Sequence, residues 1–425
     1  MDYEAVADLG PDRRRALFER TAGVESVRST VRDIVGRVRE EGDVALRQYA
    51  SEFDDVELGN VDVTDEAERA YEELDDETRE AIEDAAANVR EFHEAQLPDD
   101  WRREFSEGRE LGRRFRPIER VGVYAPGGTA AYPSSVLMGV IPAKVAGVEQ
   151  VAVATPPAEE MSPVTLAAMH VAGADRVYAA GGAQAVAALA YGTETVDRVQ
   201  KIVGPGNKFV TAAKAEVRGD VDIDFLAGPS ELLVLADETA DPGYVAADAL
   251  AQAEHDPDSS VVVVTDDEAT AGEVCTEIEA RVEEREREDT IREALDSDAS
   301  GVFAARSMSE GVLFAEEYAA EHLSIQAGDD EELLDRIDSA GSVFLGPYAP
   351  VAAGDYATGT NHVLPTNGKA KVAGGLSVDT FLRSTTVQRL DEGALADLRE
   401  TVTTLADAEG LEAHAASVDA RFEDE

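Results

Sequence analysis

The histidines of this 425-residue chain are few, and they are the side chains best suited to metal binding and to proton transfer near neutral pH. Most of them stand in short segments that also carry carboxylates, amides or glycines. These segments are Gln252–His255, Glu321–His322, Gly354–His362 and Glu409–His414. The pairing of scarce imidazoles with such partners predicts that the chemistry of the chain lies here.

One set of these residues has the character of a metal site. Gln252 and His255 are three residues apart in an expected helix, so their side chains share one face. A catalytic zinc takes three or four nitrogen or oxygen donors. Asp355, expected in a loop after Gly354, and His414 would complete such a set. The alternative is that each residue is satisfied locally, because spacing alone does not bring the four together.

Glu321 and His322 suggest acid/base chemistry. Adjacent residues of a strand or loop point in different directions, so the pair could serve one substrate from two sides. One residue would act as base toward an alcohol and the other toward water. The alternative is an ordinary Glu-His pair at a helix end.

Three glycine-rich turns follow expected strands and precede expected helices, at 124–129, 181–185 and 204–208. Glycine permits close approach of the backbone to a ligand, and a helix N-terminus offers free N–H groups to phosphate. Neither standard nucleotide fingerprint is present, so each turn alone could be purely structural. Together they predict a nucleotide site in which Tyr124, Gln184 and Asn207 could form hydrogen bonds.

Short β-branched runs alternate with helical segments from about residue 120 onward, which is typical of parallel sheets built from βαβ units. The expected strands are 121–123, 151–153, 176–178, 201–203, 232–235, 261–264, 301–303 and 342–345. Their number favours two Rossmann-like sheets with a hinge near 227–231. The first 100 residues look helical and acidic, and a polar helical arm is expected after 376.

Composition limits the partners and the location of the protein. The net charge of −51 would repel nucleic acid and anionic membranes. No apolar run is long enough to span a bilayer and no secretory signal is visible, so we expect a cytoplasmic protein. Cys275 is the only cysteine and is expected to pack in a core, and His93 is expected to be exposed and inert.

The charge also indicates adaptation to salt. Lysine is limited to six positions while Asp and Glu number 89, an imbalance that favours a protein working in molar salt. Salt would screen the self-repulsion, because the Debye length is only about 3 Å at 1 M. We therefore expect unfolding or subunit loss at low salt.

Taken in order, the motifs resemble histidinol dehydrogenase from about residue 25 to 418. The resemblance is carried by Tyr124-Ala-Pro-Gly-Gly, Gly-Gly-Ala-Gln184-Ala, Gly-Pro-Gly-Asn207-Lys, Ala-Gly-Pro-Ser230-Glu, Gln252-Ala-Glu-His255, Glu321-His322-Leu, the segment 354–366 and Glu409-Gly-Leu-Glu-Ala-His414. The family oxidises L-histidinol to L-histidine, the last step of histidine biosynthesis, through an enzyme-held aldehyde. It uses two NAD⁺ in succession and requires zinc.

The resemblance also implies roles for individual residues. Zinc would be bound by Gln252, His255, Asp355 and His414, and NAD would contact Tyr124, Gln184 and Asn207. Substrate would be held by Ser230, Gln252, His255, His322, Asp355, Glu409 and His414. His322 would take the alcohol proton and Glu321 would activate water for the aldehyde step. In the family the last zinc ligand comes from the partner subunit, which implies a homodimer with shared active sites.

The same resemblance suggests how the chain is divided into domains. We expect an N-terminal helical arm at 1–24 and a first α/β domain from 25–123 and 231–376 with the metal and acid/base residues. A second, NAD-binding α/β domain would span 124–230, and a C-terminal helical arm at 377–425 would contact the partner.

Two other functions compete with the dehydrogenase. A zinc hydrolase would use Glu321 to activate water, but it has no use for three nucleotide-type turns. A non-catalytic protein would use the metal site for assembly, and it would tolerate replacement of Glu321 and His322.

Overall fold

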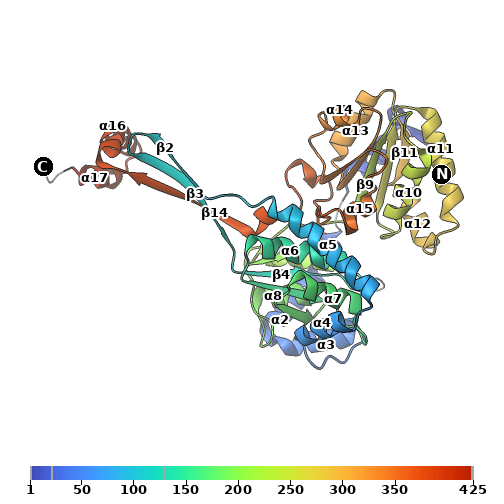
Figure 1. The fold of residues 1–425 in the computed structure, drawn as a ribbon, viewed down its shortest axis with the longest axis horizontal. Coiled ribbons are helices and arrows are strands. Elements are labelled where there is room, and N and C mark those ends of the chain that lie inside the picture. Colours follow the sequence, from blue (N-terminus) through green and yellow to red (C-terminus); the bar gives the residue numbers. More distant parts are fainter. Residues whose placement is uncertain (1, 21–22, 128–130, 423–425) are drawn as a thin grey trace. The chain divides into compact units, whose positions relative to one another are not determined.

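The computed structural model describes residues 2–20, 23–127 and 131–422. The chain forms two compact units, one from Met1–Gln96 with Glu119–Phe381 and one from Leu97–Ile118 with Leu382–Glu425. Two parallel sheets lie in the first unit and an antiparallel sheet in the second (Figure 1). Across the described helices, none combines the length and the hydropathy needed to cross a membrane.

The six-stranded sheet of the first unit is parallel throughout. Its order is β1 (Glu4–Ala5), β11 (Gly301–Ala304), β10 (Ser260–Thr265), β9 (Glu231–Ala236), β12 (His322–Gln326) and β13 (Ser342–Leu345). Leu232 and Val234 of β9 enter the core under α10 (Pro242–Ala253), α11 (Glu268–Val282) and α12 (Glu288–Leu295). Leu233 and Leu235 enter the opposite core, under α1 (Pro11–Phe18), α13 (Met308–Tyr318) and α14 (Asp330–Leu334). Burial on both faces explains the continuous apolar runs of these strands.

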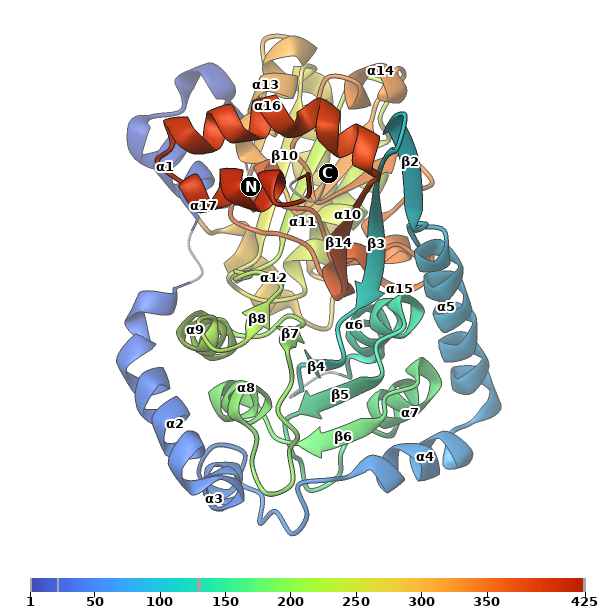
Figure 2. The same cartoon turned by 90° about the vertical axis from the view of Figure 1, so that its left-hand side faces the viewer.

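The five-stranded sheet is also parallel. Its order is β6 (Arg176–Ala179), β5 (Gln150–Thr155), β4 (Arg120–Tyr124), β7 (Lys201–Val203) and β8 (Asp222–Ile223). In Figure 2, α8 (Gly182–Tyr191) and α9 (Lys208–Val217) lie on one side of it, with α6 (Pro133–Ala146) and α7 (Pro163–Ala172) on the other. The predicted α/β class with two parallel sheets is confirmed, as are the eight expected strands.

The N-terminal third of the chain differs from the expected division. Residues 25–123 were assigned to the first α/β domain, but β4 pairs with β5 and β7 of the five-stranded sheet. Helix α2 (Arg28–Glu41) buries Val31, Ile34 and Val38 in the core that contains α8 and α9. Helices α3 (Asp43–Phe53), α4 (Thr64–Glu73) and α5 (Asp76–Glu94) complete this region. The sequence predicts the apolar stripe of α2, but it does not indicate which of the two sheets this stripe covers.

His93 of α5 corrects a second expectation. Its side chain is fully buried, with Nδ1 2.7 Å from the carbonyl oxygen of Val89. Burial lowers the pKa of this imidazole, so it is neutral in the core. The acidic composition of the helix suggested exposure, yet α5 buries one stripe that includes Ile82, Ala86 and Val89.

The second unit is an antiparallel sheet followed by two helices. Its strands have the order β14 (Leu382–Leu390), β3 (Arg109–Pro117) and β2 (Trp101–Ser106), and the helices are α16 (Glu392–Ala408) and α17 (Glu412–Asp419). The expectation of a helical arm over 377–425 was therefore wrong for nine of its residues. Strand β14 has no apolar run of its own, and it forms because it pairs along its length with β3, far away in sequence.

Candidate active site

A cavity of about 2100 Å³ opens within the first unit and is lined by residues from both parallel sheets. The glycine turns contribute Gly127, Gly182 and Gly206 from the five-stranded side. The six-stranded side contributes His255, Glu321, His322 and Asp355. The positions Gly128 and Thr129 of the first turn lie outside the described residues. In open α/β sheets ligands bind at the carboxyl ends of strands, where these turns stand.

The three expected NAD contacts all line this cavity. Tyr124 ends β4 and is buried, and its hydroxyl accepts a hydrogen bond from the Gly182 N–H at 3.0 Å. Burial raises the pKa of this phenol to about 12, so it stays protonated. Asn207 caps α9, where its side-chain oxygen accepts the N–H groups of Phe209 at 3.0 Å and Val210 at 3.3 Å. Because the helix uses this oxygen, a nucleotide contact would use the amide NH2 group of Asn207.

The turn at Gly204 is held by a buried ion pair that sequence reasoning missed. Lys214 Nζ donates to Asp224 Oδ1 at 2.6 Å and to the carbonyl oxygen of Gly204 at 2.7 Å. Asp224 Oδ2 accepts the Gly204 N–H at 2.8 Å, and both charged side chains are 3% exposed or less. A side chain at Gly204, whose φ is 109°, would collide with the Tyr124 carbonyl oxygen. The ion pair thus fixes one wall of the nucleotide side of the cavity.

Glu321 lies directly before β12 with its carboxylate buried. Its Oε2 atom accepts hydrogen bonds from Ser230 Oγ at 2.7 Å and from the Glu231 N–H at 2.9 Å. Burial raises the pKa of Glu321 to about 7, although the neighbouring imidazole and these hydrogen bonds oppose the rise. Ser230, expected to hold substrate, here holds Glu321. The carboxyl group is therefore poised to exchange a proton near neutral pH.

His322 begins β12 and faces the same cavity. Its Nδ1 atom lies 3.2 Å from the carbonyl oxygen of Glu231, so in the neutral imidazole the Nδ1–H donates and Nε2 carries the lone pair. Nε2 is buried without a hydrogen-bond partner, 3.6 Å from Asp355 Oδ1. Burial pushes the pKa of His322 down, but the carboxylates of Glu321 and Asp355 outweigh it and raise the pKa to about 9.

Three of the four expected metal ligands line the same cavity: Gln252, His255 and Asp355. Gln252 is buried near the end of α10, and its Nε2 atom has no hydrogen-bond partner. His255 follows the helix, with Nδ1 3.1 Å from the Ala251 carbonyl oxygen, which leaves Nε2 as the ligating atom. Asp355 lies in the short helix α15 (Val351–Tyr356), not in the expected loop.

Nearby imidazoles also affect the charge state of the Asp355 carboxylate. Burial acts to raise its pKa, but His322, His362 and His255 together lower the pKa below its usual range. No three His, Cys, Asp or Glu side chains stand at metal-binding positions in the part of the chain that the structure describes. A set of amide, imidazole and carboxylate donors with a buried unpartnered amide nevertheless fits zinc, which accepts nitrogen and oxygen ligands.

Glu409 and His414 belong to the second unit. Glu409 is the C-cap of α16, and His414 lies in the first turn of α17. Both side chains are exposed.

His362 belongs to the site although the sequence assigned it no role. Its Nδ1–H donates to the carbonyl oxygen of Asp355 at 3.0 Å, and Nε2 lies 3.2 Å from Ser135 Oγ of α6. The imidazole thus connects α15 with a helix of the five-stranded sheet, and burial lowers its pKa. The proximity of Asn361 and His362 to Asp355 in sequence was the available signal.

Comparison with known proteins identifies the family. The family model described as histidinol dehydrogenase matches residues 18–422. The chain is 79% identical to the histidinol dehydrogenase of Halobacterium salinarum, with all of both chains covered. It is 47% identical to that of Bacillus subtilis, covering 94% of each. The similarity to Halobacterium is consistent with the salt adaptation expected from the charge.

A solved structure extends the match to the fold. The crystal structure of histidinol dehydrogenase from Elizabethkingia anophelis superimposes with a TM-score of 0.94 at 37% identity, covering 100% of this chain and 97% of the other. The chain therefore belongs to the histidinol dehydrogenase family.

Proposed function

We propose that the chain oxidises L-histidinol to L-histidine within this cavity, with His322 as base for the alcohol step and Glu321 as base for the aldehyde step. The family and its use of NAD⁺ and zinc set the reaction. The observation that supports the division of labour is that Glu321 and His322 meet beside Asp355, in the cavity that the nucleotide turns also line. A cytoplasmic location would give the enzyme both substrates.

The alcohol step needs a base with a free lone pair. Because Nδ1–H of His322 is held by the Glu231 carbonyl oxygen, Nε2 is the atom that can accept the hydroxyl proton. As the O–H proton passes to Nε2, the hydride on the same carbon passes to the nicotinamide and the C–O bond becomes a carbonyl. The aldehyde then remains in the cavity.

The aldehyde step needs water, because the chain offers no thiol nucleophile at the site. Cys275, its only cysteine, is buried in α11 and does not line the cavity. The carboxylate of Glu321 can take a proton from water as the oxygen adds to the aldehyde carbon, which gives the hydrate as its alkoxide, with the negative charge on the former carbonyl oxygen. A second hydride transfer to NAD⁺ converts the hydrate to the carboxylic acid of histidine.

Gln252, His255 and Asp355 would hold the zinc ion. When bound, zinc orients the substrate through the imidazole and amine of histidinol, both of which are good ligands. Asp355 has a second task in this arrangement, because its carboxylate also stabilises the protonated form of His322.

A homodimer would complete the site with Glu409 and His414 from the partner copy. Among the described residues of the second unit, the buried hydrophobic side chains are only Ala394, Ala406 and Ala415. In an antiparallel pair, opposed residues share a face. By this register one face of the three-stranded sheet carries, among arginines and other polar residues, the apolar side chains Trp101, Leu111, Phe115, Leu382 and Leu390.

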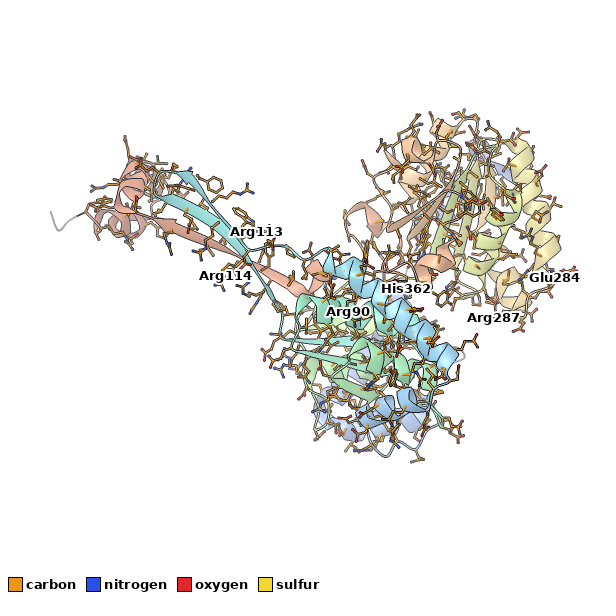
Figure 3. All side chains as sticks on the ribbon, in the orientation of Figure 1. Arg90, Arg113, Arg114, Glu284, Arg287 and His362 are labelled. Carbon is orange, nitrogen blue, oxygen red and sulfur yellow. The ribbon has the colours of Figure 1, made fainter. Side chains whose placement is uncertain are left out.

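Exposure of these residues supports a partner. Trp101 is 36% exposed, and Leu405 and Leu411, which flank Glu409, are 58% and 42% exposed. Figure 3 shows Arg113 on β3 of the same sheet, in a chain whose net charge is −51. Apolar side chains with arginine are typical of protein interfaces, so a second copy is the partner we propose.

The test is the stoichiometry of the reaction. One histidinol should yield two NADH and one histidine, with no aldehyde released. A single NADH per histidinol, with free aldehyde, would restrict the chain to alcohol oxidation. Release of product without NADH would favour the zinc hydrolase instead.

A further inference from the structure

We propose that Arg20 is a positioning residue for both Glu321 and His322, acting through the carboxylate of Glu231. The inference rests on the acid/base roles proposed above and adds a residue from the N-terminal segment, more than 200 positions away in sequence, to the catalytic apparatus.

Arg20 and Glu231 form a buried, bidentate ion pair. Arg20 Nε lies 2.8 Å from Glu231 Oε1, and Nη2 lies 3.0 Å from Oε2. Their side chains are 7% and 2% exposed. Parallel N–H···O bonds of this kind fix the orientation of a carboxylate as well as its position. Lysine, a point charge on a flexible stem, would not reproduce this geometry.

The main chain of Glu231 holds both proposed bases. Its N–H donates to Glu321 Oε2 at 2.9 Å, and its carbonyl oxygen accepts the Nδ1–H of His322 at 3.2 Å. The preceding residue, Ser230, donates to the same oxygen of Glu321. Glu231 thus sets the orientation of the Glu321 carboxylate and the tautomer of His322. Any shift of the Glu231 main chain moves both bases.

Arg20 is itself held rigidly. Its Nη1 donates to the Leu17 carbonyl oxygen at 2.8 Å, and its Nη2 donates to the Tyr318 carbonyl oxygen at 2.9 Å. The guanidinium also lies 3.7 Å from the centroid of the Tyr318 ring. A chain of fixed contacts therefore runs from α1 and α13 through Arg20 to Glu231.

The side chain of Glu231 also forms a hydrogen bond with the segment that follows α15. Oε1 accepts the Asn367 N–H at 2.7 Å, and the neighbouring Thr366 Oγ1 accepts the Gly228 N–H at 2.7 Å. These hydrogen bonds hold residues 228–231, which connect the two sheets, against residues 366–367. The carboxylate of Glu231 therefore contacts both Arg20 and the main chain of Asn367.

Burial of the pair is better explained by positioning than by stability. Desolvation of two charges often cancels their attraction, so a buried ion pair is weak evidence for a stabilising role. What this pair supplies is a fixed location for one residue, Glu231, whose main-chain N–H and carbonyl oxygen each hold one base.

The experiment uses Arg20→Lys, Glu231→Gln and the double variant Arg20→Met/Glu231→Gln in the full-length enzyme with zinc. For Arg20→Lys and Glu231→Gln we expect kcat to fall by about 10- to 100-fold, on the scale of a displacement near 1 Å. KM for histidinol and NAD⁺ and the zinc content should stay unchanged. Arg20→Lys should also keep its melting temperature, whereas Glu231→Gln should melt lower because it leaves the Arg20 charge buried without its partner. Both half-reactions should slow, because Glu231 holds both bases.

The double variant separates positioning from charge burial, because it leaves no uncompensated charge. We expect it to melt like the parent enzyme while kcat remains low. Recovery of kcat in the double variant would make the pair merely structural and overturn the inference. A normal kcat for folded Arg20→Lys and Glu231→Gln would also overturn it.

Two controls complete the design. Arg14→Lys changes an arginine of α1 that pairs with Glu317 at the surface, and it should leave kcat unchanged. Glu321→Gln and His322→Asn are measured in parallel. If they lose activity while the Arg20 and Glu231 variants do not, only this inference fails. If they retain activity, the acid/base assignment fails instead.

Discussion

At the scale of single residues, the division of work between Glu321 and His322 follows from how each is held. Both lie next to Glu231, but Glu321 accepts hydrogen bonds through one oxygen while His322 donates through Nδ1. The carboxyl group is thus prepared to take a proton from water, and the imidazole is prepared to take one from the substrate through Nε2. Each role can be separated by experiment.

Replacement of the two bases should affect different half-reactions. His322→Asn should slow alcohol oxidation by about 10²- to 10⁴-fold, the range for lost general acid/base catalysis. Glu321→Gln should spare the first hydride transfer and impair aldehyde hydration. Single-turnover NADH formation from histidinol and from histidinaldehyde measures the two steps separately. Equal loss in both steps for Glu321→Gln would contradict the assignment.

The pH dependence of the two steps should differ in the same way. A base works when deprotonated, so aldehyde oxidation should decline as pH falls below about 7, the pKa of Glu321. Alcohol oxidation should rise toward pH 9, the pKa to which the carboxylates raise His322. Glu321→Gln removes one of these carboxylates and should move the alcohol limb to lower pH. The pH–rate profile of each half-reaction tests this prediction. If the alcohol profile of Glu321→Gln does not shift, the Glu321 carboxylate does not raise the pKa of His322.

At the scale of secondary-structure elements, each part of the cavity is placed by the end of a strand or helix. Tyr124 ends β4, His322 begins β12, and Asn207 caps α9. Gln252 and His255 stand at the end of α10. Between these elements, buried ion pairs hold the connecting turns, as Lys214 and Asp224 do for the turn at Gly204.

Loss of that ion pair should weaken NAD⁺ binding without changing the chemistry. Lys214→Met leaves Asp224 buried and uncompensated, so the turn should loosen. We expect KM for NAD⁺ to rise roughly tenfold, equivalent to about 1.4 kcal/mol, with kcat at saturating NAD⁺ retained. Lys144→Met is the control, since Lys144 pairs with Asp175 at the surface. A kcat defect with normal KM would show that Lys214 acts on the reaction itself.

At the scale of the whole molecule, two features suggest that the enzyme works as a salt-dependent dimer. The second unit exposes apolar side chains beside Glu409 and His414, and the chain carries a net charge of −51. An exposed apolar surface is typical of a protein–protein interface, and a large net charge needs counter-ions to screen its self-repulsion.

Mixed dimers test the shared site. His414→Ala and His255→Ala should each abolish zinc binding at the sites they damage. If His414 serves the partner's cavity, a mixed dimer of the two variants has one intact site and one doubly damaged site. Co-refolded mixtures should therefore recover up to about one quarter of the parent activity for random pairing. If zinc content and activity do not recover in mixtures proven to contain mixed dimers, His414 does not act across the interface.

Low salt should destabilise the protein. Transfer from molar KCl to dilute buffer lengthens the Debye length from about 3 Å to 30 Å, so the acidic surface repels itself and its partner. Circular dichroism and size-exclusion chromatography over a KCl series should show dissociation or unfolding before the buffer is salt-free. A folded, active dimer in dilute buffer would refute salt adaptation.

The sequence by itself determined the alternation of strands and helices, the family and the candidate site residues that line the cavity. These are local properties: the buried run of Val261–Val264 predicts a strand wherever it packs. The shared helix face expected for Gln252 and His255 holds less well, because α10 ends at Ala253 and His255 follows it. The sequence also indicated the excess of acid and the absence of a catalytic thiol.

Only the tertiary structure decided which distant segments meet. Strand β14 depends on hydrogen bonds to β3, about 270 residues away, and its own sequence has no apolar pattern that predicts a strand. The pairs Arg20–Glu231 and Lys214–Asp224, and the contact of His362 with Ser135, depend on the packing of separate elements. A charged or polar residue that looks solvent-exposed in sequence becomes part of a site when folding removes its water and supplies a partner, and that exchange is set by the fold as a whole.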